Sequence, residues 1–116
     1  MAALNAISAF HRLGWVHGDV RRPNIVPVSK DSAFLIDLAH SFSSTDRDDR
    51  QSDFGMFLCS WLHVPISHRE RGWRDALLRQ GQEAKQLVDL VMSLYKDTQT
   101  PIAPVIDKLA TCLQPR

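Results

Sequence analysis

A histidine, an aspartate, two arginines and an asparagine stand close together in the stretch WVHGDVRRPNIV, residues 15–26. Asn24 follows Asp19 by five residues, and Asp37 follows Asn24 after two short apolar runs. A carboxylate and an amide oxygen placed together form a hard-oxygen site suited to Mg²⁺, whose coordination phosphate oxygens and water complete. A second carboxylate nearby is able to accept a proton from an attacking hydroxyl. We therefore expect a metal-and-phosphate site here, with a polar turn as the alternative.

The elements that must position these residues begin with a β-hairpin. The apolar runs IVPV (25–28) and AFLI (33–36) are separated by the polar turn SKDS, which is typical of a hairpin. Pro27 limits the first strand to an edge or to a break in pairing. Asn24 enters the first strand and Asp37 leaves the second, so the hairpin places these two residues side by side.

Taken singly, each of these residues has an ordinary explanation. Asp19 beside Gly18 is more typical of a turn, and Asn24 of a local hydrogen bond. Asp37 alone is explained as the end of a strand, and a lone His17 as a core or turn histidine. Their joint spacing favours the site over these separate explanations.

Helical spacing dominates the rest of the chain. The polar stretch 40–52 predicts a loop, and Ser52 is the expected N-cap of the helix that follows. Thr100 and Pro101 are the expected cap and first residue of the last helix. The predicted fold is α+β, mostly helical, as a single domain over residues 1–116. Its helices are expected at 2–13, 53–63, 68–79, 82–95 and from Pro101 onward.

Composition narrows the class of protein. The chain is 44% hydrophobic with a net charge of +1, so a nucleic-acid interface is not expected. We also expect no membrane span and no signal peptide, and therefore a cytoplasmic protein. Cys59 and Cys112 are expected to be buried free thiols, with a disulfide as the alternative.

The motifs HGDVRRPN and LIDLA resemble the catalytic loop and the metal-binding strand end of the protein-kinase-like superfamily. In that pattern, His-x-Asp is followed by Asn five residues after the Asp, and then by a metal-binding Asp at the end of a hairpin. SDFGMFLCSWL resembles the buried central helix of the C-terminal lobe. The resemblance covers roughly residues 2–64. The H-G-D loop of the chain resembles those of small-molecule kinases, of the aminoglycoside- or choline-kinase type, and of atypical or fungal-type protein kinases.

The resemblance implies a role for each chemical residue. Asp19 would orient or deprotonate the acceptor hydroxyl, while Asn24 and Asp37 would hold Mg²⁺ on the phosphates of ATP. Arg21 stands where many members of the superfamily keep a lysine near the transferred phosphate, and it preserves the positive charge.

Three further residues would support this site. His17 would pack against Leu38, which stands at the phenylalanine position of D-F-G, and Asp53 would hydrogen-bond the backbone around His17. The implied organisation is a catalytic loop and hairpin (15–39), a short activation-segment-like loop (40–52) and a helical remainder (53–114).

The sequence also departs from the superfamily pattern. Gly18 replaces the arginine of regulated protein kinases, so control by a phosphorylated loop is not expected. Only 16 residues separate Asp37 from Asp53, without A-P-E, which leaves little room for docking a peptide. The chain contains no G-x-G-x-x-G loop and no V-A-I-K lysine, so the N-lobe that covers ATP is expected to be absent.

Two functions therefore compete. The first is the C-lobe of an ATP- and Mg²⁺-dependent phosphotransferase, whose acceptor is a hydroxyl-bearing protein or small molecule. The second is a non-catalytic, pseudokinase-like module, with a protein partner covering the apolar surface that a missing lobe leaves. An unrelated small helical domain is the third and weakest alternative.

Overall fold

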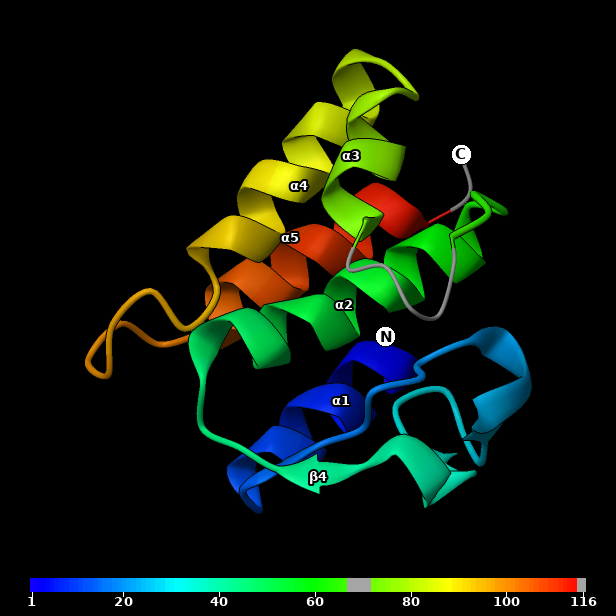
Figure 1. The fold of residues 1–116 in the computed structure, drawn as a ribbon, viewed down its shortest axis with the longest axis vertical. Helices are drawn as coiled ribbons and strands as arrows, with labels where there is room; N and C mark the ends of the chain where they lie inside the picture. Colours follow the sequence, from blue (N-terminus) through cyan, green and yellow to red (C-terminus); the bar gives the residue numbers. More distant parts are fainter. Residues whose placement is uncertain (67–71, 115–116) are drawn as a thin grey trace.

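The computed structural model describes residues 1–66 and 72–114. They form a small α+β fold in which helices dominate and the strands are short (Figure 1). The helices are α1 (Ala2–Arg12), α2 (Arg47–Trp61), α3 (Trp73–Leu78), α4 (Gln82–Ser93) and α5 (Ala103–Leu113). The strands are β1 (Trp15–Val16), β2 (Ile25–Pro27), β3 (Ala33–Leu35) and β4 (Phe42–Ser43).

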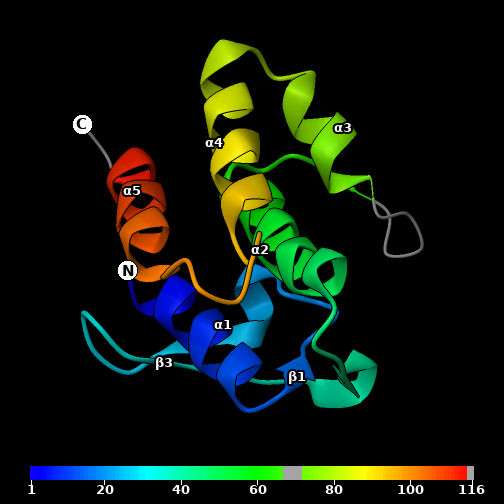
Figure 2. The same cartoon turned by 90° about the vertical axis from the view of Figure 1, so that its left-hand side faces the viewer.

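Helix α2 lies at the centre of this arrangement. It contacts α1 on one side and α3 and α4 on the other, while α5 packs against α4 and α1 (Figures 1 and 2). The two small sheets lie with α1, because β1 and β3 both pack against that helix. The segment from residue 15 to residue 43 therefore forms one side of the molecule, and α3, α4 and α5 form the other.

The predicted hairpin is present. Strands β2 and β3 are antiparallel, with Ile25 opposite Leu35 and Val26 opposite Phe34. Pro27 pairs with Ala33 at the end of this ladder, as suits a residue that lacks a backbone donor. A second, unpredicted pair joins β1 to β4, with Val16 opposite Phe42.

The prediction of a loop over 40–52 is wrong for most of its length. Residues 42 and 43 are a strand, and α2 already begins at Arg47. The N-cap is Asp46 rather than Ser52, since the Asp46 side chain accepts hydrogen bonds from the backbone nitrogens of Asp48 and Asp49. A capping aspartate followed by acidic residues stabilises the first turn of a helix even where no apolar stripe marks it.

The other helix boundaries also shift. Helix α5 begins at Ala103 with Ile102 as its N-cap, so Thr100 and Pro101 lie outside it, and Pro104 is the proline of its first turn. The predicted helix 68–79 is present as α3, Trp73–Leu78, and its residues 68–71 lie outside the described residues. Helix α4 ends at Ser93, two residues before the predicted end.

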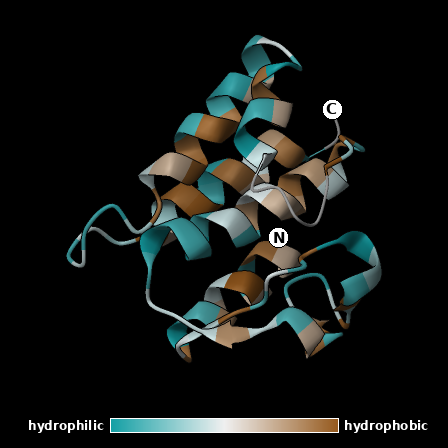
Figure 3. Ribbon diagram, in the orientation of Figure 1, coloured by the Kyte–Doolittle hydropathy of each residue, from teal (hydrophilic) through white to brown (hydrophobic). Residues whose placement is uncertain are grey.

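The hydrophobic core forms around α2. Phe54, Phe57 and Leu58 are buried against side chains of α1, α3, α4 and α5. The first turns of α2 are hydrophilic and its later turns more hydrophobic (Figure 3). Gly55 lies against the indole of Trp73, where a Cβ atom would overlap the ring. The sequence therefore places glycine inside this helix, despite its low helix propensity, because the crossing of Trp73 leaves no room for a side chain.

The two cysteines differ in exposure. Both cysteines are free, but only Cys59 is buried, and Cys112 is exposed on α5. The prediction that Cys112 is buried is wrong because it lies beside the apolar stripe of α5 rather than on it.

Within residues 1–66 and 72–114, none of the helices has the length and apolar character needed to cross a bilayer.

Candidate functional site

A buried carboxylate holds the loop that carries the chemical residues. Asp53, on α2, accepts a hydrogen bond from the backbone nitrogen of His17 to Oδ2 and one from that of Gly18 to Oδ1, both at 2.9 Å. The hydrogen bond expected between Asp53 and the backbone around His17 is therefore present. Because Asp53 is only 1% exposed, these bonds are shielded from competing water.

A histidine that the sequence did not single out completes this arrangement. The Nε2 atom of His11 lies 2.8 Å from Oδ2 of Asp53, and its Nδ1 lies 2.6 Å from the hydroxyl of Tyr95. With its hydrogen on Nε2 facing the carboxylate, the ring accepts the tyrosine hydroxyl at Nδ1. Burial raises the pKa of Tyr95 above its ordinary value, so the hydroxyl keeps the proton that it donates.

The signal for His11 was present in the sequence. This residue shares a helical stripe with Leu4 and Ile7, and all three are buried. A polar ring on a buried stripe needs hydrogen-bond partners, which indicates a network rather than a simple core position. The identity of the partners, Asp53 and Tyr95, could not be read from the spacing.

Gly18 is required by its geometry. Its φ of +84° lies in the left-handed region, and a Cβ atom there would lie 2.6 Å from the carbonyl oxygen of His40. The backbone at Gly18, immediately before Asp19, therefore lies very close to the backbone of His40. An arginine at this position, as in regulated protein kinases, is incompatible with this local packing.

Asp19 and Asn24 lie together in the loop. The Nδ2 atom of Asn24 donates to the carbonyl oxygen of Asp19 at 2.9 Å and lies 3.2 Å from the Asp19 carboxylate. Both partners are acceptors, so the amide nitrogen must face them and Oδ1 is turned elsewhere. Both side chains are buried, with 2% of Asp19 and 6% of Asn24 exposed.

Arg21 forms an ion pair with Asp19. Its Nε and Nη2 atoms reach the two carboxylate oxygens at 2.8 and 3.2 Å. The Arg21 side chain is 45% exposed, whereas that of Asp19 is 3% exposed. The positive charge predicted beside Asp19 is therefore present, on a side chain that is open to solvent.

His17 joins the loop to the hairpin. Its Nδ1 accepts a hydrogen bond from the backbone nitrogen of Asp19 at 3.1 Å, and its Nε2 donates to the carbonyl oxygen of Ile36 at 2.8 Å. A neutral ring with its hydrogen on Nε2 satisfies both partners. Leu38 is 52% exposed, and its expected packing against His17 stays a prediction.

The hairpin brings Asn24 and Asp37 to neighbouring positions. The backbone nitrogen of Ile36 donates to the carbonyl oxygen of Asn24 at 2.9 Å, so Asp37 follows directly after a residue bonded to Asn24. Asp37 is exposed and has a φ of 57°, in the left-handed region that non-glycine residues seldom occupy. His63 and Tyr95 have the same left-handed φ, so the backbone angle alone does not identify Asp37 as a ligand.

The oxygen donors fit Mg²⁺ in type but are few. Asn24 and Asp37 supply an amide oxygen and a carboxylate, which is the kind of partial set that magnesium completes with phosphate oxygens. Among residues 1–66 and 72–114, no three His, Cys, Asp or Glu side chains are grouped so that they could hold a metal ion. A metal at this hairpin would therefore depend on a phosphate ligand.

An apolar surface adjoins the same hairpin. Val26 and Phe34, which face each other across the strands, are 42% and 64% exposed. Val28, Ile36 and Leu38 are 58%, 43% and 52% exposed. Exposed apolar side chains gathered on so small an element are typical of a surface that binds a ligand or another polypeptide.

Comparison of the sequence with protein-family models and with curated proteins finds no match.

Proposed function

We propose that this chain is the C-terminal lobe of a protein-kinase-like phosphotransferase, which transfers a phosphoryl group from ATP to a hydroxyl acceptor. The observation that carries the proposal is the loop in which Asp19 and Asn24 are buried and hydrogen-bonded together. Asp53 fixes this loop by accepting hydrogen bonds from the backbone nitrogens of His17 and Gly18. The pairing of the hairpin strands brings Asp37 to a position next to Asn24. An ordinary turn needs none of these buried polar contacts.

In this proposal the oxygen donors hold the nucleotide. The Oδ1 atom of Asn24 is available because its amide nitrogen is bonded to Asp19, and the carboxylate of Asp37 is exposed. These two groups would hold Mg²⁺, which supplies charge neutralisation on the phosphates during transfer. The exposed apolar side chains of Val26 and Phe34 offer a surface for the base of the nucleotide.

Asp19 and Arg21 would act on the acceptor and the transferred group. The carboxylate of Asp19 would accept a hydrogen bond from the acceptor hydroxyl and orient it toward the phosphate. Arg21 covers that carboxylate and must share or release it when the acceptor binds. The Arg21 side chain is 45% exposed, so it has room to move into solvent, while Asn24 stays within hydrogen-bond distance of the buried Asp19 carboxylate. Its guanidinium would then meet the negative charge of the phosphate.

The test is isothermal calorimetry with ATP in the presence of Mg²⁺. Asp37→Ala removes one proposed metal ligand, and Asp31→Ala is the matched control, an exposed aspartate in the turn of the same hairpin. We expect the wild type and D31A to bind alike and D37A to bind at least roughly tenfold more weakly, the loss that removing a charged ligand typically causes. Equal binding by D37A and D31A, or no binding by the wild type, would contradict the proposal.

The exposed apolar surface of the hairpin favours the second candidate, a non-catalytic module that binds a protein partner. Phe34, at 64% exposure, is its most exposed aromatic side chain, and Leu78, at 42%, is an exposed apolar residue on α3 for comparison. This candidate predicts that Phe34→Ser abolishes partner binding and Leu78→Ser does not. It also predicts no Mg²⁺-ATP binding by any variant, which separates it from the phosphotransferase.

A further inference from the structure

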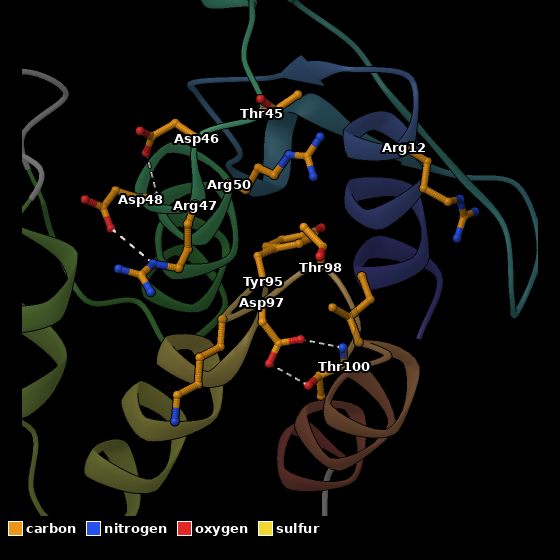
Figure 4. A pocket seen from close by; sticks show the side chains of 12 residues that line it. Arg12, Thr45, Asp46, Arg47, Asp48, Arg50, Tyr95, Asp97, Thr98 and Thr100 are labelled. Carbon is orange, nitrogen blue, oxygen red and sulfur yellow. Dashed lines mark hydrogen bonds and ion pairs between the residues drawn. The ribbon is translucent and has the colours of Figure 1, made fainter.

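Charges of both signs line a cavity between α1, α2 and the segment that joins α4 to α5, with a volume of about 660 Å³ (Figure 4). In Figure 4, Arg12 points away from Arg50 and Tyr95, and Asp46 and Asp48 lie on the opposite side of the pocket from Arg12. Because its positive and negative groups do not converge by sign, the charge of this cavity favours no class of ligand. A second cavity differs in this respect.

The second cavity lies between the hairpin, the start of α1 and the end of α2, and its volume is about 370 Å³. Figures 1 and 2 show the hairpin beside the start of α1. The side-chain amide of Asn5 donates to the carbonyl oxygen of Asp31 in the hairpin turn at 3.4 Å, which ties these two elements together. The volume is within the range of small-molecule sites, about 300–1,000 Å³. The residues proposed above for phosphoryl transfer do not line this cavity.

The hairpin gives the cavity an apolar wall. Successive side chains of a strand point to opposite faces of its sheet. Ile25 and Ala33 line the cavity, whereas their neighbours Val26 and Phe34 are exposed and do not. The wall is therefore the face of the hairpin opposite to the exposed apolar surface described above.

Two aromatic rings of α2 form another wall, and a cation is held against it. Phe57 and Trp61 line the cavity, with their ring centroids 5.8 Å apart. The guanidinium carbon of Arg22, which also lines the cavity, lies 4.5 Å from the centroid of the Trp61 ring. The Nη2 atom of Arg22 donates to the carbonyl oxygen of Trp61 at 2.8 Å. These two contacts fix the charge of Arg22 at the aromatic wall.

The charge of this cavity has one sign. Arg22 and Lys30 are its charged side chains, and none of the described residues that line it is acidic. Within residues 1–66 and 72–114, the ion pairs of the chain do not include Arg22. A guanidinium carries five N–H donors, and the bond to Trp61 uses one of them. Arg22 therefore keeps donors for an anionic ligand.

We propose that this cavity binds a small aromatic carboxylate, with its ring between the hairpin and Trp61 and its carboxylate on the guanidinium of Arg22. The apolar walls remove the ring from water, and the planar guanidinium matches a carboxylate through two parallel hydrogen bonds. The described lining presents no carboxylate that would repel the anion. The site stands independently of the proposed phosphotransferase, since it uses different residues.

The probe for this site is 2-naphthoate, with 2-naphthamide as its uncharged analogue. The chain has three tryptophans, and the loss of one indole N–H signal in Trp61→Phe assigns that of Trp61 in the NMR spectrum. We expect 2-naphthoate to shift this signal saturably. It should bind about tenfold more tightly than 2-naphthamide, as a charge-assisted contact typically provides.

Three variants separate the charge from the apolar walls, and circular dichroism checks that each is folded. Arg22→Gln should weaken the binding of 2-naphthoate about tenfold and leave that of 2-naphthamide unchanged. Arg79→Gln, at an exposed arginine after the last residue of α3, changes the net charge equally and should bind both probes as the wild type does. Ala33→Leu adds bulk to the wall formed by β3 and should weaken the binding of both probes.

Five outcomes would overturn the proposal. They are no saturable shift of the Trp61 signal in the wild type, equal affinity for the two probes, equal weakening in R22Q and R79Q, unchanged binding by folded A33L, and a Trp61 signal that moves with protein concentration alone. The last outcome would show that a second copy of the chain covers the cavity instead.

Discussion

The carboxylate of Asp53 accepts a hydrogen bond from the backbone nitrogen of His17 at 2.9 Å, across 36 positions of the sequence. The same carboxylate accepts from Gly18 and from the ring of His11. The central helix thereby fixes the path of the loop that carries Asp19. The position of Asp19 therefore depends on this contact.

Removing this carboxylate should be among the most damaging single changes. Asp53→Ala leaves one buried and one partly buried backbone N–H group and a buried imidazole without their acceptor, so we expect a loss of about 3–5 kcal/mol in the free energy of unfolding. Urea unfolding followed by circular dichroism measures it. Asp107→Ala, an exposed aspartate on α5, is the control and should change stability by less than about 0.5 kcal/mol. Similar losses in both variants would show that Asp53 does not hold the loop.

Comparing Gly18 with Gly14 separates the cost of a left-handed backbone from the cost of steric overlap at a new Cβ atom. Gly14 and Gly18 have similar positive φ angles, +88° and +84°, but only at Gly18 would a Cβ atom meet another residue, the carbonyl oxygen of His40. Gly14→Ala should therefore cost about 1–2 kcal/mol for the left-handed backbone alone. Gly18→Ala should cost about 1–3 kcal/mol more, because the backbone around His40 must shift. Thermal unfolding of the two variants checks this difference, and equal losses would contradict the close approach.

The effect of Gly55→Ala on the free energy of unfolding should change sign when Trp73 is replaced. In the wild type, Gly55→Ala should destabilise by about 1–3 kcal/mol, because the new methyl group overlaps the indole. In a Trp73→Val background, where the ring is gone, the same substitution should stabilise the helix by up to about 1 kcal/mol. A double-mutant cycle in urea measures both steps. The same effect of Gly55→Ala in both backgrounds would show that Trp73 does not crowd this position.

The two cysteines should react at different rates. Burial raises the pKa of Cys59 to about 11, so at pH 8 its thiol is neutral as well as shielded, while Cys112 is exposed. A chromogenic disulfide reagent should label one thiol per folded chain and both after unfolding, and Cys112→Ser should abolish the fast reaction. Rapid labelling of folded C112S at pH 8 would contradict the burial of Cys59.

The same thiol makes stability dependent on pH on the alkaline side. The folded state keeps Cys59 protonated, whereas the unfolded chain ionises at the ordinary value of 9.0. The contribution of the Cys59 thiol to the free energy of unfolding is therefore fully present below about pH 9. It is lost as the pH rises toward about 11. Comparing the wild type with Cys59→Ala across this range isolates the contribution of the thiol.

Local patterns were sufficient for several elements. The two apolar runs around SKDS predicted the hairpin, and the stripe of Ala84, Leu87, Val88 and Val91 predicted α4. The start of α2 was missed because its first turns are polar throughout and depend on the cap at Asp46. Strands β1 and β4 were missed because two residues each are too few to show an alternating pattern.

The sequence by itself determined which groups are available: Asp19, Asn24 and Asp37 at the spacing of a hairpin, and Asp53 at the head of an apolar helical segment. These follow from local order, since helix and strand periods depend on neighbouring residues alone. Only the tertiary structure decided that His11 and Tyr95, 84 positions apart, meet beside Asp53. It also decided that Arg12 and Arg50 line one cavity. Such contacts depend on how the helices cross, which is set by the packing of their buried faces and leaves no periodic trace in the chain.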